Sequence, residues 1–185
     1  MPEFFSLIKI FNDKQIKINW VIPITRYHFK EVSNKIKKLI HENDVQAIVL
    51  EKNYDLLKEA DIAIACSGTI TLELALFKIP TIAVYKTDIL SASIGRMLVN
   101  FKNVILPNFL VGEDFVPFLF QEKCTAHNIN KFLKAYINKI EEKNHLFKIN
   151  SNKIVKNMNY TDTSEFNFSK NSGNKIIEII NAYKY

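Results

Sequence analysis

The spacing of apolar residues switches repeatedly between two periods along the chain. Short runs rich in Ile, Val and other apolar residues predict buried β-strands at residues 16–25, 46–50, 61–65, 81–85 and 103–106. Segments with apolar residues three and four positions apart predict helices at residues 4–11, 27–41, 53–60, 69–77, 88–100, 113–120 and 128–138. This alternation is typical of an α/β fold with a Rossmann-like, doubly wound parallel sheet.

The apolar spacing becomes irregular from about residue 141 onward. It predicts one or two loose helices over residues 146–158, a polar loop over residues 159–173 and a terminal helix over residues 172–183. We therefore expect residues 1–140 to form the α/β domain and residues 141–185 to form a C-terminal helical tail.

A small polar turn stands where the predicted strand at residues 61–65 ends and the next helix begins. It contains Ser67, Gly68 and Thr69, and Glu73 follows about one helical turn later. Ligands of α/β sheets bind outside the carboxyl ends of the strands, and the N–H groups at a helix N-terminus suit a phosphate. Glycine lets the backbone approach a ligand closely, and a carboxylate at Glu73 can accept hydrogen bonds from sugar hydroxyls. The alternative is an ordinary helix cap with an ordinary first-turn acid, and the turn by itself leaves both interpretations open.

Composition limits the remaining chemistry. The chain has 185 residues, of which 48% are hydrophobic, enough for a packed core. Two distant cysteines favour a reduced, cytoplasmic protein, and the four histidines lack metal-ligand spacing, so we expect no metal and no cofactor. The formal net charge is +6, but only Arg26 and Arg96 are arginines, which argues against sequence-specific binding to nucleic acid. A weak attraction to anionic lipid remains compatible with this charge.

A resemblance to a known family rests on two segments. Residues 67–86 read SGTITLELALFKIPTIAVYK, and residues 104–125 read VILPNFLVGEDFVPFLFQEKCT. In this order and at this spacing, they strongly resemble the Ser-Gly-Thr-x-x-Leu-Glu turn and the Leu-Pro-Asn block of lipid-A-disaccharide synthases. The resemblance covers roughly residues 1–137. It implies the C-terminal, donor-binding domain of a GT-B glycosyltransferase of family 19.

The resemblance also implies site residues and a reaction. Ser67, Gly68 and Thr69 match the turn that binds the diphosphate of UDP, Glu73 matches the acid that faces the ribose, and Asn108 matches the donor-facing Asn of the Leu-Pro-Asn block. The family transfers 2,3-diacylglucosamine from UDP-2,3-diacylglucosamine to 2,3-diacylglucosamine 1-phosphate. It releases UDP, inverts the anomeric carbon and needs no metal. The alternatives are a non-catalytic remnant that binds UDP and another GT-B enzyme that uses a UDP-sugar.

Three parts of the family pattern are not found in the chain. They are the N-terminal acceptor domain with its catalytic Asp, the turn that supplies an Arg to the donor phosphates, and the first strand of the donor domain. In the strand order 3-2-1-4-5-6 that first strand is central. The strands near Ile18 and Ile62 would be the second and the fourth, with nothing between them. We therefore expect this chain to be a fragment, from a split synthase, a truncated synthase or a mis-started reading frame. We expect no catalytic residue in it, no activity by the chain alone, and a need for a separate N-terminal half.

The segment 89–102 carries a second hypothesis, because the family's substrates are acylated. Leu90, Arg96, Phe101 and Lys102 could contact the inner membrane from the cytoplasm, as apolar and basic residues of an interfacial helix do. The alternative is that Leu90 and its apolar neighbours pack on the sheet.

Overall fold

The computed structural model describes residues 2–12, 18–66, 68–87 and 104–158. The predicted helices at residues 88–100 and 172–183 therefore lie outside the described residues. The elements alternate between helix and strand, as the sequence predicted. In chain order they are α1 (Pro2–Asn12), β1 (Val21–Ile24), the short 3-10 helix η1 (Arg26–His28), α2 (Phe29–Glu42), β2 (Ile48–Glu51), α3 (Tyr54–Lys58), β3 (Ala63–Cys66), α4 (Thr69–Leu76), β4 (Thr81–Tyr85), α6 (Leu106–Val111), β5 (Phe118–Phe120), the 3-10 helix η3 (Gln121–Lys123), α7 (Ala126–Ile137) and α8 (Ile140–Asn157).

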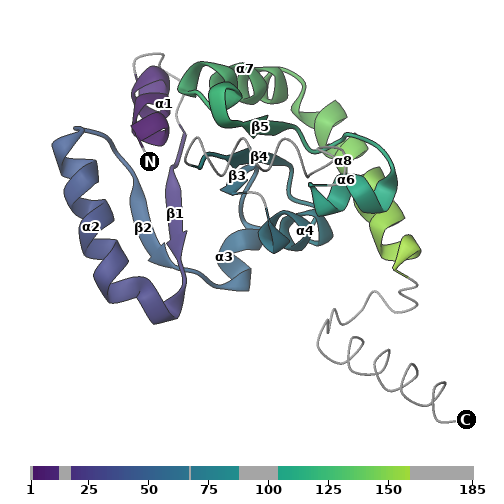
Figure 1. The fold of residues 1–185 in the computed structure, drawn as a ribbon, viewed down its shortest axis with the longest axis horizontal. Helices are drawn as coiled ribbons and strands as arrows, with labels where there is room; N and C mark the ends of the chain where they lie inside the picture. The colour runs from purple at the N-terminus through teal and green to yellow at the C-terminus, as the bar shows by residue number, and fades with distance from the viewer. Residues whose placement is uncertain (1, 13–17, 67, 88–103, 159–185) are drawn as a thin grey trace, which may run out of the picture.

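The strands form two parallel sheets. β1 pairs with β2, and β3, β4 and β5 pair in that order. Figure 1 shows β1 lying between β2 and the three-stranded sheet. The described strands thus follow the order β2-β1 and then β3-β4-β5. On the sides of β1 and β3 that face each other, neither strand pairs with another described strand. This arrangement is the α/β fold with parallel strands expected of a Rossmann-like domain.

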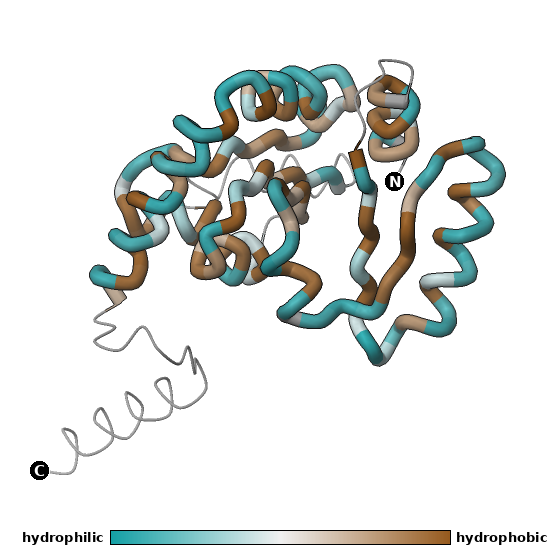
Figure 2. The backbone as a smooth tube through the Cα atoms, turned by 180° about the vertical axis from the view of Figure 1, so that it is seen from behind, coloured by the Kyte–Doolittle hydropathy of each residue, from teal (hydrophilic) through white to brown (hydrophobic). Residues whose placement is uncertain are grey.

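One hydrophobic cluster connects the two sheets. Leu7 and Phe11 of α1 are fully buried in it together with Ile82 of β4 and several residues of α7. The partly buried residues packed against this cluster include Ile18 and Trp20 before β1, Ile62 before β3 and Ile64 in β3. Figure 2 shows hydrophobic stretches, in brown, along the strands of both sheets. Because α1 packs on α7, the two sheets share a single core on this side.

Two predicted elements around residues 103–120 are wrong. Of the predicted strand at 103–106, residues 104 and 105 form a bend, and α6 begins at Leu106 with Pro107 in its first turn. Proline is tolerated there because the N–H groups of the first turn have no helical partner. The predicted helix at 113–120 ends instead in the three-residue strand β5. Pro117 stands directly before β5, and a proline interrupts a helix at such a position.

Up to residue 157, the irregular apolar spacing belongs to one helix of 18 residues, α8. The predicted loop at residues 159–173 lies outside the described residues. Phe147 and Ile154 of α8 are buried in a cluster with Ala75 of α4 and with Ile105 and Val116 from the α6 region. The helix therefore packs on the α/β core, while a domain boundary near residue 140 stays a prediction.

Tyr136 connects α7 to α8 and to the chain before β3. Its hydroxyl donates to Asn144 Oδ1 and lies 3.4 Å from the carbonyl oxygen of Asp61. Burial raises the pKa of Tyr136 to about 12. At a pH between the ordinary tyrosine pKa of about 10 and this value, the Tyr136 hydroxyl has lost its proton in the unfolded chain and retains it in the folded chain.

We therefore expect stability to fall as the pH rises from about 10 to about 12. Tyr136→Phe should remove most of this slope and cost about 1 kcal/mol at neutral pH. Urea titrations across this pH range test the prediction, and an unchanged slope in the Phe variant contradicts it. Tyr27, which is 96% exposed, provides the matched control as Tyr27→Phe.

Candidate functional site

Gly68 begins the helix that follows β3. It is the N-cap of α4, with φ 145° and ψ −163°, a backbone conformation that residues with a side chain rarely adopt. No side chain caps this helix end, and Thr69 is exposed in the first turn. The Thr71 hydroxyl donates to the Gly68 carbonyl at 2.7 Å, which stabilises the sharp turn. Among the predicted phosphate-binding residues, Gly68 and Thr69 thus lie at an open helix N-terminus, and Ser67 lies outside the described residues.

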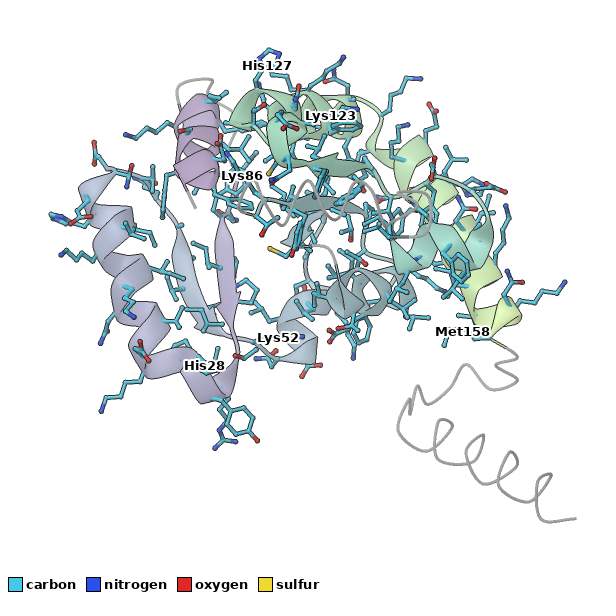
Figure 3. The ribbon with its side chains drawn as sticks, in the orientation of Figure 1. His28, Lys52, Lys86, Lys123, His127 and Met158 are labelled. Carbon is cyan, nitrogen blue, oxygen red and sulfur yellow. The ribbon has the colours of Figure 1, made fainter. Side chains whose placement is uncertain are left out.

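Glu73 forms an ion pair that the sequence did not reveal. Its carboxylate accepts two hydrogen bonds from Lys52 Nζ, at 2.9 and 3.1 Å, and both side chains are about one quarter exposed. Lys52 follows β2 directly, and its backbone N–H donates to the Ile24 carbonyl at the end of β1. Figure 3 shows Lys52 on the side of the β1–β2 sheet that faces α3 and α4. The carboxyl ends of β1 and β2 therefore meet the first turns of α4.

Lys52 and the N-terminus of α4 are both positive, while Glu73 supplies a carboxylate next to them. A cation and a helix N-terminus suit phosphate oxygens, and a carboxylate suits sugar hydroxyl groups. Lys52 does not belong to either of the two sequence segments that predicted the site. Its position immediately after a strand was the signal that could have identified it.

Asn108 is buried in α6 rather than exposed to a ligand. Its side-chain amide donates to the Val116 carbonyl and accepts from the Val116 N–H, both at 2.9 Å. Gly112 closes the same helix in the left-handed conformation and donates its N–H to the Asn108 carbonyl. Asn108 therefore fastens the segment after α6 onto the helix. Helix α6 also contacts α4, so the two predicted site segments are neighbours, although both Asn108 amide atoms bond within the chain.

The predicted membrane contacts belong to a segment outside the described residues. Leu90, Arg96, Phe101 and Lys102 fall in residues 88–103, beyond the described ranges. The helices of the described residues include none with the length and apolar character of a membrane span. The described residues also contain no group of three His, Cys, Asp or Glu side chains that could hold a metal ion.

Comparison with known proteins decides the family. The model of the lipid-A-disaccharide synthetase family matches residues 1–170. The chain belongs to this family. The lipid-A-disaccharide synthase of Francisella tularensis subsp. novicida (strain U112) is 35% identical to this member over 136 residues, which cover 72% of this chain and 35% of the relative. That of Francisella philomiragia subsp. philomiragia is 30% identical over 188 residues, which cover 98% of this chain and 45% of the relative.

The lipid-A-disaccharide synthetase family consists of glycosyltransferases of lipid A biosynthesis. The resemblance predicted from the two sequence segments is thus confirmed. This synthetase-family chain spans less than half of the length of the curated relatives it matches.

Proposed function

We propose that the chain is the donor-binding half of a lipid-A-disaccharide synthase. The whole enzyme would transfer 2,3-diacylglucosamine from UDP-2,3-diacylglucosamine to 2,3-diacylglucosamine 1-phosphate, with inversion and release of UDP. The observation that carries the proposal is the position of the Ser-Gly-Thr turn. It follows β3 at the carboxyl edge of a parallel sheet and opens α4 with Gly68 in a glycine-specific conformation.

Each site residue has a place in this proposal. Ser67, Gly68 and Thr69 bind the diphosphate, with the N-terminus of α4 attracting its negative charge. Glu73 accepts hydrogen bonds from the ribose hydroxyls, and Lys52 orients the Glu73 carboxylate and adds a positive charge beside the phosphates. Asn108 keeps the Leu-Pro-Asn block folded against the donor site through Val116.

The proposal assigns the acceptor site and the catalytic acid or base to the part of the family pattern that has no counterpart among these residues. The chain alone then binds UDP and transfers no sugar. Transfer requires the N-terminal, acceptor-binding half of the family in addition to these residues. Turnover of donor and acceptor by the purified chain alone would show that this part of the proposal is wrong.

Titration calorimetry with UDP tests the donor site directly. At a UDP concentration 100 times the Kd, binding should raise the free energy of unfolding by about 2.7 kcal/mol. Uridine lacks the diphosphate and should bind more weakly by at least about tenfold. As a matched carboxylate control, Glu59→Gln on the exposed end of α3 should leave UDP binding unchanged. Absence of both heat and thermal shift would favour a remnant that has lost the donor site.

The proposal also places the chain in the cytoplasm at the inner membrane, with residues 89–102 next to the acylated substrates. Sedimentation with vesicles tests this contact. Pelleting should require anionic lipid and should weaken in an Arg96→Gln/Lys102→Gln variant, and charge-independent pelleting would contradict it.

A further inference from the structure

Strand β4 is buried along its length except at its carboxyl end. Its first four residues are buried, whereas Tyr85, the last, is 42% exposed. The Tyr85 ring stacks on that of Phe120, the last residue of β5, with the ring centroids 6.1 Å apart and an angle of 8° between the ring planes. Tyr85 and Phe120 thus form an aromatic platform at the carboxyl ends of two paired strands.

The aromatic platform lies on the same face of the sheet as α4. Tyr85 and Ala83 are two residues apart in β4, so their side chains share a face. Ala83 is buried in one cluster with Ala75 of α4, whereas Val84, between Ala83 and Tyr85, is buried in a cluster with residues of α1 and α7. Figure 1 shows α4 and α7 on opposite sides of this sheet. The glycine turn that opens α4 is therefore on the side of the platform.

The glycine turn and the aromatic platform are neighbours along the carboxyl edge of the sheet. Gly68 lies two residues past the end of β3, and the register pairs Cys66 of β3 with Val84, the residue before Tyr85. Neighbouring strands are about 4.8 Å apart. The platform therefore begins about one strand spacing from the glycine turn and ends about two strand spacings from it, at Phe120.

Glu73 sets the direction in which a bound nucleotide-sugar would lie. Its carboxylate is bonded to Lys52, which follows β2, so Glu73 lies on the side of α4 toward the β1–β2 sheet. Tyr85 lies on the other side of Gly68, because β4 pairs with the edge of β3 that faces away from β1. A donor with its ribose at Glu73 and its diphosphate at Gly68 therefore extends its sugar toward Tyr85.

Gln121 fixes the shape of the aromatic platform. It directly follows Phe120, and its side-chain amide donates to the Thr87 carbonyl at 2.9 Å and accepts from the Thr87 N–H at 2.8 Å. Gln121 is 7% exposed, and its φ of 48° is uncommon for a residue other than glycine. The chain after β4 is thus fastened to the end of β5. Backbone strain of this kind is typical of binding sites, and a rigid surface loses little entropy when a ligand covers it.

We propose that the aromatic platform binds a fatty acyl chain carried by the sugar of the donor, with Tyr85 as a residue that determines specificity for acylated donors. The proposal rests on the proposed function, because UDP at the glycine turn brings the acyl chain to this position. An acyl chain gains free energy by covering ring surface that is otherwise in contact with water. The uracil base is not the occupant, since it extends from the ribose away from the diphosphate and thus away from Tyr85.

Calorimetry with the full chain compares donors that differ only in their acyl chains. The probes are UDP, UDP-glucosamine and UDP-2,3-diacylglucosamine with butanoyl, octanoyl or dodecanoyl chains, each below the concentration at which it forms micelles. Each methylene group that leaves water tightens binding about fourfold. The affinity should therefore rise with chain length and exceed that for UDP-glucosamine by about tenfold or more, which corresponds to about two buried methylene groups.

Variants of Tyr85 locate the acyl chain. Tyr85→Ala should reduce the gain from acylation about tenfold and leave the affinity for UDP unchanged, which also shows that the variant is folded. Tyr85→Phe keeps the ring and should keep the gain. Phe132, which is 39% exposed on α7, provides the matched control, and Phe132→Ala should leave both affinities unchanged.

A spin label at the end of the acyl chain tests the same contact without a substitution. In the unaltered chain, the labelled donor should broaden the amide resonances of Tyr85 and Phe120 and spare that of Phe132. Broadening at Phe132 alone would overturn the proposal, and so would equal broadening at all three residues. This measurement decides the question even if Tyr85→Ala does not fold.

The outcomes separate this proposal from the proposed function. Binding of UDP without a gain from acylation overturns the acyl-chain subsite and leaves the donor site intact, as does a gain that Tyr85→Ala does not reduce. Absence of UDP binding to the unaltered chain overturns both proposals. If Tyr85→Ala instead abolishes pelleting with lipid vesicles and leaves the affinity for acylated donors unchanged, the platform contacts a membrane and the subsite is overturned.

Discussion

Asn108→Ala should lower the free energy of unfolding by about 2–4 kcal/mol, the largest stability effect we expect from a single substitution in this chain. The reason is that the substitution leaves two buried backbone groups of Val116 without partners. Asn108 is 5% exposed and Val116 is 1% exposed, so water does not readily replace the lost amide. Each unsatisfied buried group costs about 1–3 kcal/mol.

Urea unfolding measures this loss, and two further variants identify its cause. Asn108→Asp keeps the size of the side chain but cannot donate to the Val116 carbonyl as a carboxylate, so it should also destabilise the chain. Asn157→Ala removes an amide that donates to the Leu110 carbonyl at 2.7 Å from an exposed position, and it should cost less than about 1 kcal/mol. Equal losses for Asn108→Ala and Asn157→Ala would show that the Asn108 amide has no special structural role.

Elements were predicted correctly from the sequence where local chemistry and tertiary structure agree. The helices near Asn53 and Thr125 begin at side chains that accept from backbone N–H groups, at 2.6 Å for Asn53 and 3.2 Å for Thr125. Strand β4 is buried on both faces and was visible as a continuous apolar run. These elements have a signal within a few residues, so no knowledge of the partner segments was needed.

The prediction from sequence was wrong where a short element depends on distant contacts. Strand β5 has only three residues and exists because β4 provides its single paired edge in the sheet. The same apolar residues, Phe118–Phe120, fit a helix equally well when their pairing with β4 is unknown. The bonds between Asn108 and Val116 likewise have no signal in the sequence and are found only in the folded loop, while contact of Asn108 with the donor stays a prediction.

Some residues of the candidate site could be predicted from the sequence, and others could not. The glycine turn and Glu73 were identified from the sequence because a strand, a turn and a helix follow one another directly. Lys52 lies 21 residues before Glu73, and the two meet only because β2 and β3 end at a common edge. A pair that depends on sheet topology has no signature in sequence spacing, and the same holds for the facing edges of β1 and β3.

Glu73→Gln should weaken UDP binding by about 10–100-fold while changing stability little. A charge-assisted hydrogen bond to a hydroxyl contributes about 1.5–3 kcal/mol, which corresponds to this range. The stability effect should be smaller because glutamine keeps a side-chain oxygen that can accept from Lys52 Nζ, and both side chains keep some contact with solvent. Calorimetry with UDP and thermal unfolding without ligand measure the two effects separately.

The choice of ligand then distinguishes the roles of the two paired side chains. If Glu73 contacts the ribose, Glu73→Gln should leave the affinity for pyrophosphate unchanged or slightly increased, since one negative charge is removed. Lys52→Met should weaken binding of both UDP and pyrophosphate, because Lys52 adds positive charge beside the diphosphate. If Glu73→Gln instead lowers the affinity for both ligands equally, Glu73 acts by holding Lys52 in place, and the ribose contact would have to be assigned to another residue.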